Sequence, residues 1–280
     1  MSAELKLKAI EIRKKLLSMI YKAKSGHTGG SLSCVDILVS LHYGVMRLNP
    51  KDPKWVDRDR FILSKGHSVE AYYAVLADLG FFSETELETY CRFGSRLTGH
   101  PTTKVPGVEV NTGALGHGLA VGVGMALAGK IDKKDYKVFV LMGDGELGEG
   151  SVWEAAQVAS HHKLDNLVAI VDRNRLQISG PTEEILRLED LQTKWTAFGW
   201  KVLRADGHDI DQLISLFKTL PIVHQTPHLV IAQTIKGKGI SFIENRKEWH
   251  HHVPNDDEYK RAMEELDEQI RELEKSCTHK

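Results

Sequence analysis

The chain has 280 residues, 41% of them hydrophobic, and its 37 Lys and Arg residues nearly balance its 38 Asp and Glu residues. This length is enough to bury the core of one large α/β domain, and a net charge of −1 gives no support to nonspecific binding of nucleic acid or of a membrane. The cysteines (Cys34, Cys91 and Cys277) are too sparse for a disulfide framework, and no run is long and apolar enough for a signal peptide or a membrane span, so we expect a cytoplasmic protein.

The first half of the chain predicts helices separated by glycine-rich breaks. Apolar residues recur at helical spacing in residues 4–24, and the run Gly26-His27-Thr28-Gly29-Gly30 is expected to end that helix. The small-residue segment that begins at Gly113 is expected to open a closely packed helix, because its glycines permit tight backbone approach. The other elements expected here are helices at 33–43 and 69–79, a short strand at 60–64 and an irregular segment at 91–113.

The second half contains the clearest pattern, which is a strand, a helix and a second strand in that order. Residues 137–142 and 167–172 are apolar and rich in β-branched side chains, and residues 151–162 between them have one apolar helical face. This order is typical of an α/β fold in which a parallel sheet is flanked by helices. Further strands are expected at 200–203 and 229–234, and an amphipathic helix at 258–275.

Two oxygen-bearing side chains follow the two strands of this unit. Asp144 comes directly after the first strand, inside Gly143-Asp144-Gly145, and Asn174 comes just after the second. A right-handed crossover places the carboxyl ends of both strands at the same edge of the sheet, so the two side chains should converge. A carboxylate and an amide oxygen suit Mg²⁺, which keeps other positions for water and phosphate. The pattern therefore predicts a diphosphate held through a magnesium ion.

A dinucleotide site is the competing interpretation of the same loop. Residues 143–148 match GxGxxG between a strand and a helix, and Asp172 lies near the position of a ribose-binding acid. However, Asp144, Glu146 and Glu149 crowd this loop. Like charges about 4 Å apart repel by about 4 kcal/mol per pair at an effective dielectric constant near 20. We therefore favour a metal-bridged diphosphate over a bare dinucleotide pyrophosphate.

At this point the sequence resembles the transketolase family. Gly143-Asp144-Gly145 and the later Asn174 match the thiamine-diphosphate motif GDG-x(25–30)-N. Further segments resemble the histidine and glycine motifs of transketolases from about residue 5 to 255: Ser25–Gly30, Ser64–His67, Gly99–Pro101, Thr112–Gly116 and Trp249-His250. The resemblance implies a thiamine-diphosphate-binding domain at 1–255, followed by a C-terminal amphipathic helix at 256–280.

A complete transketolase also has a pyrimidine-binding domain, which carries the glutamate that activates the cofactor, and a C-terminal domain. The resemblance covers only the first domain. It therefore implies the N-terminal subunit of a split transketolase, active with a second subunit in an α2β2 assembly and transferring a two-carbon ketol unit between ketose and aldose phosphates. The alternatives are another thiamine-diphosphate enzyme, such as a deoxyxylulose-phosphate synthase fragment or a 2-oxo-acid dehydrogenase α-subunit, a non-enzymatic cofactor-binding subunit and an NAD-binding oxidoreductase.

The resemblance also implies roles for individual residues. Catalytic roles fall to His27, His100 and His250, with His251 as the alternative to His250. Magnesium ligation falls to Asp144, Asn174 and the backbone carbonyl of Leu176. Contacts with thiamine diphosphate fall to His67, Gly113, Ala114, Leu115, Gly145, Asn174 and His250. Two features stay open: Glu149 either bridges to a neighbouring subunit or is a solvated helix-start acid, and the Lys236–Gly239 loop either touches phosphate or only lies beside the site.

Overall fold

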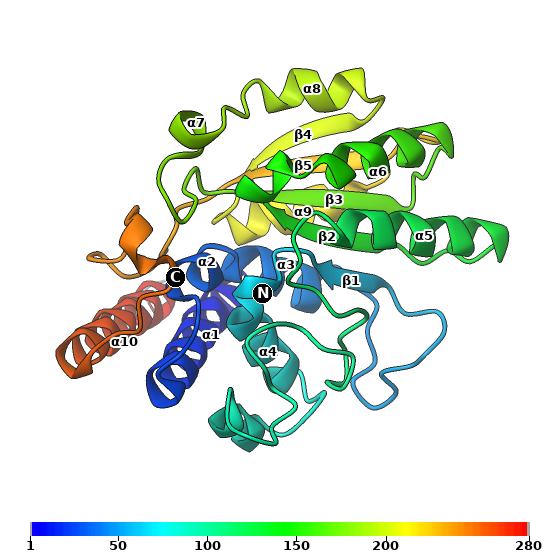
Figure 1. The fold of residues 1–280 in the computed structure, drawn as a ribbon. Helices are drawn as coiled ribbons and strands as arrows, with labels where there is room; N and C mark the ends of the chain where they lie inside the picture. The colour runs from blue at the N-terminus through cyan, green and yellow to red at the C-terminus, as the bar shows by residue number, and fades with distance from the viewer. Residues whose placement is uncertain (1, 279–280) are drawn as a thin grey trace.

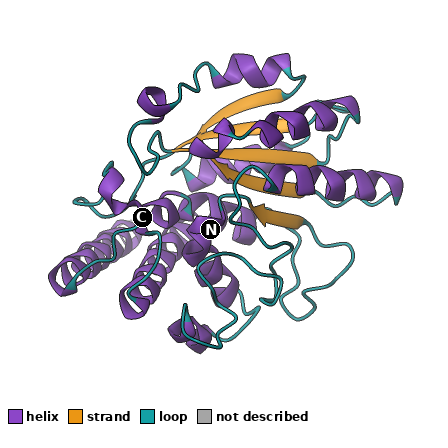
Figure 2. Ribbon diagram, in the orientation of Figure 1, coloured by secondary structure: helices purple, strands orange, loops and turns teal. Residues whose placement is uncertain are grey.

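The apolar runs of the chain form one parallel sheet. In the computed structural model, which describes residues 2–278, the sheet has five strands in the order β1-β2-β3-β5-β4 (Figures 1 and 2). Its strands are β1 (Arg60–Leu63), β2 (Val138–Gly143), β3 (Leu167–Arg173), β4 (Lys201–Asp206) and β5 (His228–Gln233). The prediction of a parallel sheet flanked by helices is therefore confirmed.

Helices cover both faces of the sheet. The α-helices are α1 (Ser2–Ala23), α2 (Thr28–Ser33), α3 (Val35–Gly44), α4 (Val69–Asp78), α5 (Gly118–Ile131), α6 (Gly150–His161), α7 (Thr182–Ile185), α8 (Leu191–Ala197), α9 (Ile210–Thr219) and α10 (Asp256–Thr278). Helices α1 to α5 precede β2 in the chain, and the later helices follow the strands β2 to β5. Short 3-10 helices occur at Gly66–Ser68, Glu84–Thr89, Gly145–Gly148 and Lys247–His250.

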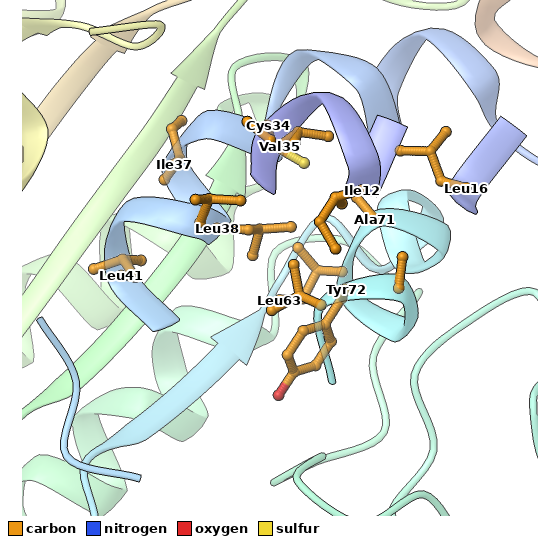
Figure 3. Packing of buried hydrophobic residues seen from close by; sticks show 14 of the residues in the cluster. Ile12, Leu16, Cys34, Val35, Ile37, Leu38, Leu41, Leu63, Ala71 and Tyr72 are labelled. Carbon is orange, nitrogen blue, oxygen red and sulfur yellow. The ribbon is translucent and has the colours of Figure 1, made fainter. Parts of the chain in front are cut away.

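Alternate residues of each strand point to opposite faces, which divides the core into two layers. Along β2, Phe139 and Leu141 pack with α1, α3, α4 and α9, whereas Val140 and Met142 pack with α5, α6 and α8 (Figure 1). Figure 3 shows the first layer from close by, where Ile12 of α1, Leu38 of α3 and Tyr72 of α4 converge beside β1. Burial on both faces explains why β2 and β3 read as continuous apolar runs.

Of the two helix boundaries predicted from glycine content, one is confirmed and one is wrong. Helix α1 ends at Ala23, just before the run from Gly26 to Gly30, and a new helix, α2, begins within that run at Thr28. The helix expected from Gly113 begins only at Gly118. Gly113 and Gly116 have φ values of +136° and +83°, which a right-handed helix cannot contain. Helix α9 was not predicted.

The fold places several segments around the carboxyl edge of the sheet. In-register pairing of Gly143 with Asp172 puts the loops after β2 and β3 side by side, as the crossover predicts. The amphipathic helix α10 packs along α1, where Ala262 and Leu266 are buried (Figure 1). Among the described residues, no helix has the length and hydropathy needed to cross a membrane.

Candidate functional site

A cavity of about 430 Å³ lies at the carboxyl edge of β2 and β3. Most of the predicted site residues line it: His27, His67, Gly113, Leu115, Asp144, Gly145, Asn174, Leu176 and His250. Two are placed differently. His100 is outside the lining but has its ring centroid 5.8 Å from that of His27, and Ala114 is exposed to solvent outside the lining.

Asp144 lies at the base of the cavity and is almost fully buried. Its Oδ2 accepts hydrogen bonds from Arg173 Nη1 (3.0 Å) and from the Arg175 amide (2.6 Å). Its Oδ1 accepts from the Gly145 amide (2.8 Å), so that predicted phosphate donor is bonded to the carboxylate in this state. Burial and the nearby Asp172 carboxylate raise the pKa of Asp144, although Arg173 opposes them.

Asn174 and Leu176 bring two more oxygen atoms to the same place. The Asn174 side-chain Oδ1 accepts a hydrogen bond from the Leu176 amide (3.1 Å), and the Leu176 carbonyl accepts one from Lys236 Nζ (3.3 Å). Both residues and Asp144 line the same cavity. This donor set consists only of oxygen atoms and therefore fits the Mg²⁺ ion that the family implies.

Two buried lysines supply positive charge beside these oxygens. Lys65 and Lys236 both line the cavity and are at most 2% exposed. Lys65 forms an ion pair with Asp172 and donates to the Gly30 carbonyl (3.0 Å). Burial and the charge of Lys65 lower the pKa of Lys236 to about 8. Two cations at the base of the cavity fit the anionic diphosphate of the cofactor.

The acidic residues of the loop all line the cavity, namely Asp144, Glu146 and Glu149. The Glu146 carboxylate also accepts hydrogen bonds from Ser64 Oγ and from the amides of Gly116 (2.9 Å) and Gly143 (3.1 Å). These bonds connect the loop after β2 to the segment before α5, so Glu146 has a structural role that the loop sequence did not indicate.

The structure gives a stronger reason against a dinucleotide site. Asp172, the residue in the position of the ribose-binding acid, is fully buried inside β3. Its carboxylate accepts hydrogen bonds from Lys65, Thr234 Oγ1 and Ser33 Oγ, the last at 2.6 Å. A carboxylate that is already saturated by internal donors and closed to solvent is not available to a ribose hydroxyl.

Histidines from four separate segments meet above the oxygen donors. The ring centroid of His27 lies 5.5 Å from that of His67, 5.8 Å from that of His250 and 4.4 Å from that of His251. The predicted grouping of His27, His67, His100 and His250 is thus observed. His251 joins them, so both histidines that competed for one position are present at the cavity.

The surroundings keep several of these imidazoles neutral. Burial, together with the charge of Lys236, lowers the pKa of His250 to about 2. Burial and the charge of Lys65 hold the pKa of His67 well below its usual value. Burial and His27 lower the pKa of His100. A neutral imidazole has one donor and one acceptor nitrogen, so it can both accept and return a proton.

A buried glutamate, Glu70 of α4, supports the histidine cluster from behind. Its carboxylate accepts hydrogen bonds from the His27 amide (2.8 Å), Ser31 Oγ (2.6 Å) and Tyr90 OH (2.7 Å). Burial opposes its ionisation, but these bonds outweigh burial and lower the pKa of Glu70. One of its oxygens lies 3.8 Å from His27 Nδ1.

Two residues of this site, Lys65 and Glu70, were not predicted, although each had a visible signal in the sequence. Lys65 stands inside the motif Ser64–His67, and Glu70 follows that motif by three residues. His251 was considered only as an alternative to His250. Because a strand, a helix start and a loop bring these residues together, periodicity within one segment carries no information about their contacts.

Comparison with known proteins agrees with this geometry. Residues 6–271 match the family described as transketolase, thiamine diphosphate binding domain. An apulose-4-phosphate transketolase subunit of Phocaeicola vulgatus is 54% identical over 271 residues, which are 97% of this chain and 96% of that protein. A 6-deoxy-6-sulfo-D-fructose transketolase subunit of a Clostridium species is 40% identical over 267 residues, 95% of this chain and 97% of that protein.

Solved structures show the same fold within longer chains. A transketolase mutant from Pichia stipitis superimposes with a TM-score of 0.86 at 34% identity, covering 94% of this chain but 40% of its own. The predicted resemblance and the thiamine-diphosphate-binding fold are thereby confirmed. The chain belongs to the transketolase family and corresponds to its thiamine-diphosphate-binding part, which relatives of the same length form as a separate transketolase subunit.

Proposed function

We propose that this chain is the diphosphate-binding subunit of a thiamine-diphosphate-dependent transketolase, which moves a two-carbon ketol unit between ketose and aldose phosphates. The observation that carries the proposal is the layered cavity. Oxygen ligands and buried lysines lie at its base, and a cluster of histidines lies beside them. A cofactor with an anionic end and a reactive ring requires both layers.

The base of the cavity would hold the magnesium ion and the diphosphate. Asp144, Asn174 and the Leu176 carbonyl supply the metal ligands, and Lys236, now bonded to that carbonyl, would turn towards phosphate oxygens. The Gly145 amide, which now donates to Asp144 Oδ1, would be the backbone donor for a phosphate oxygen.

The histidine layer would handle protons on the sugar. Bound thiamine diphosphate supplies a carbon nucleophile and electron sink. His27, His100 and His250 are the residues proposed to position substrate hydroxyls and to accept or return their protons. The lowered pKa values of His100 and His250 suit this task, because a protonated imidazole has no acceptor nitrogen.

The names of the relatives indicate which sugars to test as substrates. The name of the relative with 54% identity specifies apulose 4-phosphate, and that of the relative with 40% identity specifies 6-deoxy-6-sulfo-D-fructose. We propose apulose 4-phosphate as the first substrate to test. We also propose a second subunit, carrying the pyrimidine-binding and C-terminal domains, in an α2β2 assembly, because full-length transketolases extend well beyond this chain.

Calorimetric titration tests the cofactor site on the purified chain. Thiamine diphosphate is titrated with and without Mg²⁺ into wild type, Asp144→Ala and, as a matched control, Asp257→Ala, which removes an exposed carboxylate at the start of α10. Binding should require Mg²⁺ in wild type and in the control, and should be lost in Asp144→Ala. Mg²⁺-independent binding of NAD, or unchanged thiamine diphosphate binding by Asp144→Ala, would contradict the proposal.

Activity is tested with the partner that co-purifies from the native source. The reconstituted pair should convert apulose 4-phosphate in the presence of an aldose phosphate, and the chain alone should be inactive. Turnover by the chain alone would show that the second subunit is not required. Turnover of the sulfonated sugar but not of apulose 4-phosphate would overturn the substrate assignment while leaving the transketolase assignment intact.

A further inference from the structure

Three imidazoles at the mouth of the cavity form a group that the transketolase reaction does not require as a unit. We propose that His27, His250 and His251 bind a transition-metal ion, with Zn²⁺ as the fitting ion, at a site separate from the Mg²⁺ site. One potential ligand nitrogen from each residue lies within 4.8 Å of the other two. The inference concerns a second ligand of the cavity and does not depend on the proposed sugar chemistry.

The three ligand nitrogens need to move only a short distance towards one another to surround an ion. Zinc–imidazole bonds of about 2.0–2.1 Å place ligating nitrogens about 3.3 Å apart in a tetrahedral site. The ring centroid of His251 lies 4.4 Å from that of His27 and 4.6 Å from that of His250, so the three rings are in contact at one place. His251 is exposed, so rotation of its side chain can complete the approach while the two less exposed rings stay in place.

Each of the two less exposed histidines has its Nδ1 near an ionisable group of the protein. Lys236 Nζ lies 2.9 Å from His250 Nδ1. Ligation of a metal through Nε2 requires the ring proton to be on Nδ1, so Lys236 would release a proton to solvent and accept this hydrogen bond from Nδ1. His27 Nδ1 is buried, has no hydrogen-bond partner among the described residues, and lies 3.8 Å from the Glu70 carboxylate. Metal-bound histidines commonly direct their second nitrogen to a carboxylate, which orients the ring and raises its basicity. Glu70 is placed to do this for His27 once a metal polarises the ring.

Ligand chemistry separates this site from the magnesium site below it. Imidazole nitrogen suits Zn²⁺, Cu²⁺ and Ni²⁺, whereas Mg²⁺ prefers the oxygens of Asp144, Asn174 and Leu176. Three histidines also leave a fourth position for water, as in open zinc sites. Binding releases any proton on a ligating nitrogen to solvent. The nearby Lys236 charge opposes a cation, so we expect weaker affinity than in a structural zinc site.

Binding at this position would block the enzyme reversibly. His27 and His250 are two of the residues proposed to contact substrate, and an ion that ligates both removes their free nitrogens. The expected consequence is inhibition by Zn²⁺ that a chelator reverses and that added Mg²⁺ does not. This consequence rests on the proposed function, whereas metal binding itself does not.

Metal binding is measured on the full-length chain without the partner. Co²⁺ is added as a spectroscopic probe for tetrahedral nitrogen ligation, and Zn²⁺ affinity is obtained by competition and by calorimetry in excess Mg²⁺. The test variant is His251→Asn, at an exposed position, and the control is His161→Asn with His162→Asn, which removes two adjacent exposed histidines elsewhere. Circular dichroism verifies the fold of each variant.

Wild type and the control should bind one Zn²⁺ tightly enough to displace Co²⁺, with a visible tetrahedral Co²⁺ band. His251→Asn should lose the band and bind Zn²⁺ at least tenfold more weakly. Equal affinity of wild type and His251→Asn, or the absence of the band in wild type, would overturn the proposal. Loss of binding in the control instead would assign the metal to the pair His161 and His162.

Discussion

The ion pair between Lys65 and Asp172 gives the most direct test of how the floor of the cavity is held together. Both side chains are at most 1% exposed, and Lys65 Nζ also donates to the Gly30 carbonyl. Replacement of Lys65 by methionine keeps most of the alkyl stem but removes the charge. Asp172 then remains buried with only neutral donors, of which the Ser33 hydroxyl is one.

Breaking a buried ion pair from one side costs about 3–5 kcal/mol, because the remaining charge is uncompensated. Domains of ordinary stability unfold with about 5–15 kcal/mol, so Lys65→Met should lose a large part of the total. Burial opposes ionisation of Asp172, but Lys65 together with the hydrogen bonds from Ser33 and Thr234 outweighs burial and lowers the pKa of Asp172. Without Lys65, burial raises this pKa, so the deficit should be greatest near pH 7.5 and should shrink as the pH falls towards the unfolded value of about 3.9.

The assay is urea unfolding followed by tryptophan fluorescence, at pH 7.5 and at pH 5.5. The control is Lys134→Met, which breaks the exposed ion pair between Lys134 and Asp57 (2.8 Å). It should leave the urea midpoint unchanged. Lys65→Met combined with Asp172→Asn should be less destabilised than the sum of the two single variants. A Lys65→Met midpoint equal to that of the control, or a deficit that grows at lower pH, would refute this reasoning.

Two further predictions concern the packing of α5 and a buried histidine. In Gly118→Ala the new Cβ would lie 2.3 Å from Ser64 Oγ, so we expect the free energy of unfolding to fall by about 1–3 kcal/mol. In Gly124→Ala, on the same helix, the new Cβ meets nothing within 4 Å, so we expect urea unfolding to show a gain of about 0.5–1 kcal/mol. Equal effects of the two substitutions would contradict the steric argument. Burial lowers the pKa of His42 to about 4, despite its hydrogen bond to the Leu38 carbonyl. Because folded His42 stays neutral while the unfolded chain takes up a proton, the stability of the protein is unaffected by His42 above the unfolded pKa of about 6.5 and falls by up to about 3 kcal/mol as the pH falls towards 4. His42→Gln should make the free energy of unfolding depend less on pH in this range. An unchanged slope would refute the prediction.

The sequence alone determined the central part of the fold and one pair of site residues. The runs that form β2 and β3 are buried on both faces, so their continuous apolar character was visible without a structure. Parallel pairing with a right-handed crossover then requires Asp144 and Asn174 to lie at one edge of the sheet. These conclusions rest on local periodicity and on a topological rule, and both can be read from one stretch of chain.

Only the tertiary structure decided which polar groups of the site are available. The Asp172 carboxylate is bonded to Lys65 inside the sheet and is closed to a ligand, and Glu146 is held by a hydrogen bond from Ser64. Similarly, His27 and His251 are separated by most of the chain, yet their rings lie 4.4 Å apart. The partner of a side chain depends on packing between elements that are distant in the sequence. Periodicity within one segment carries no information about that packing.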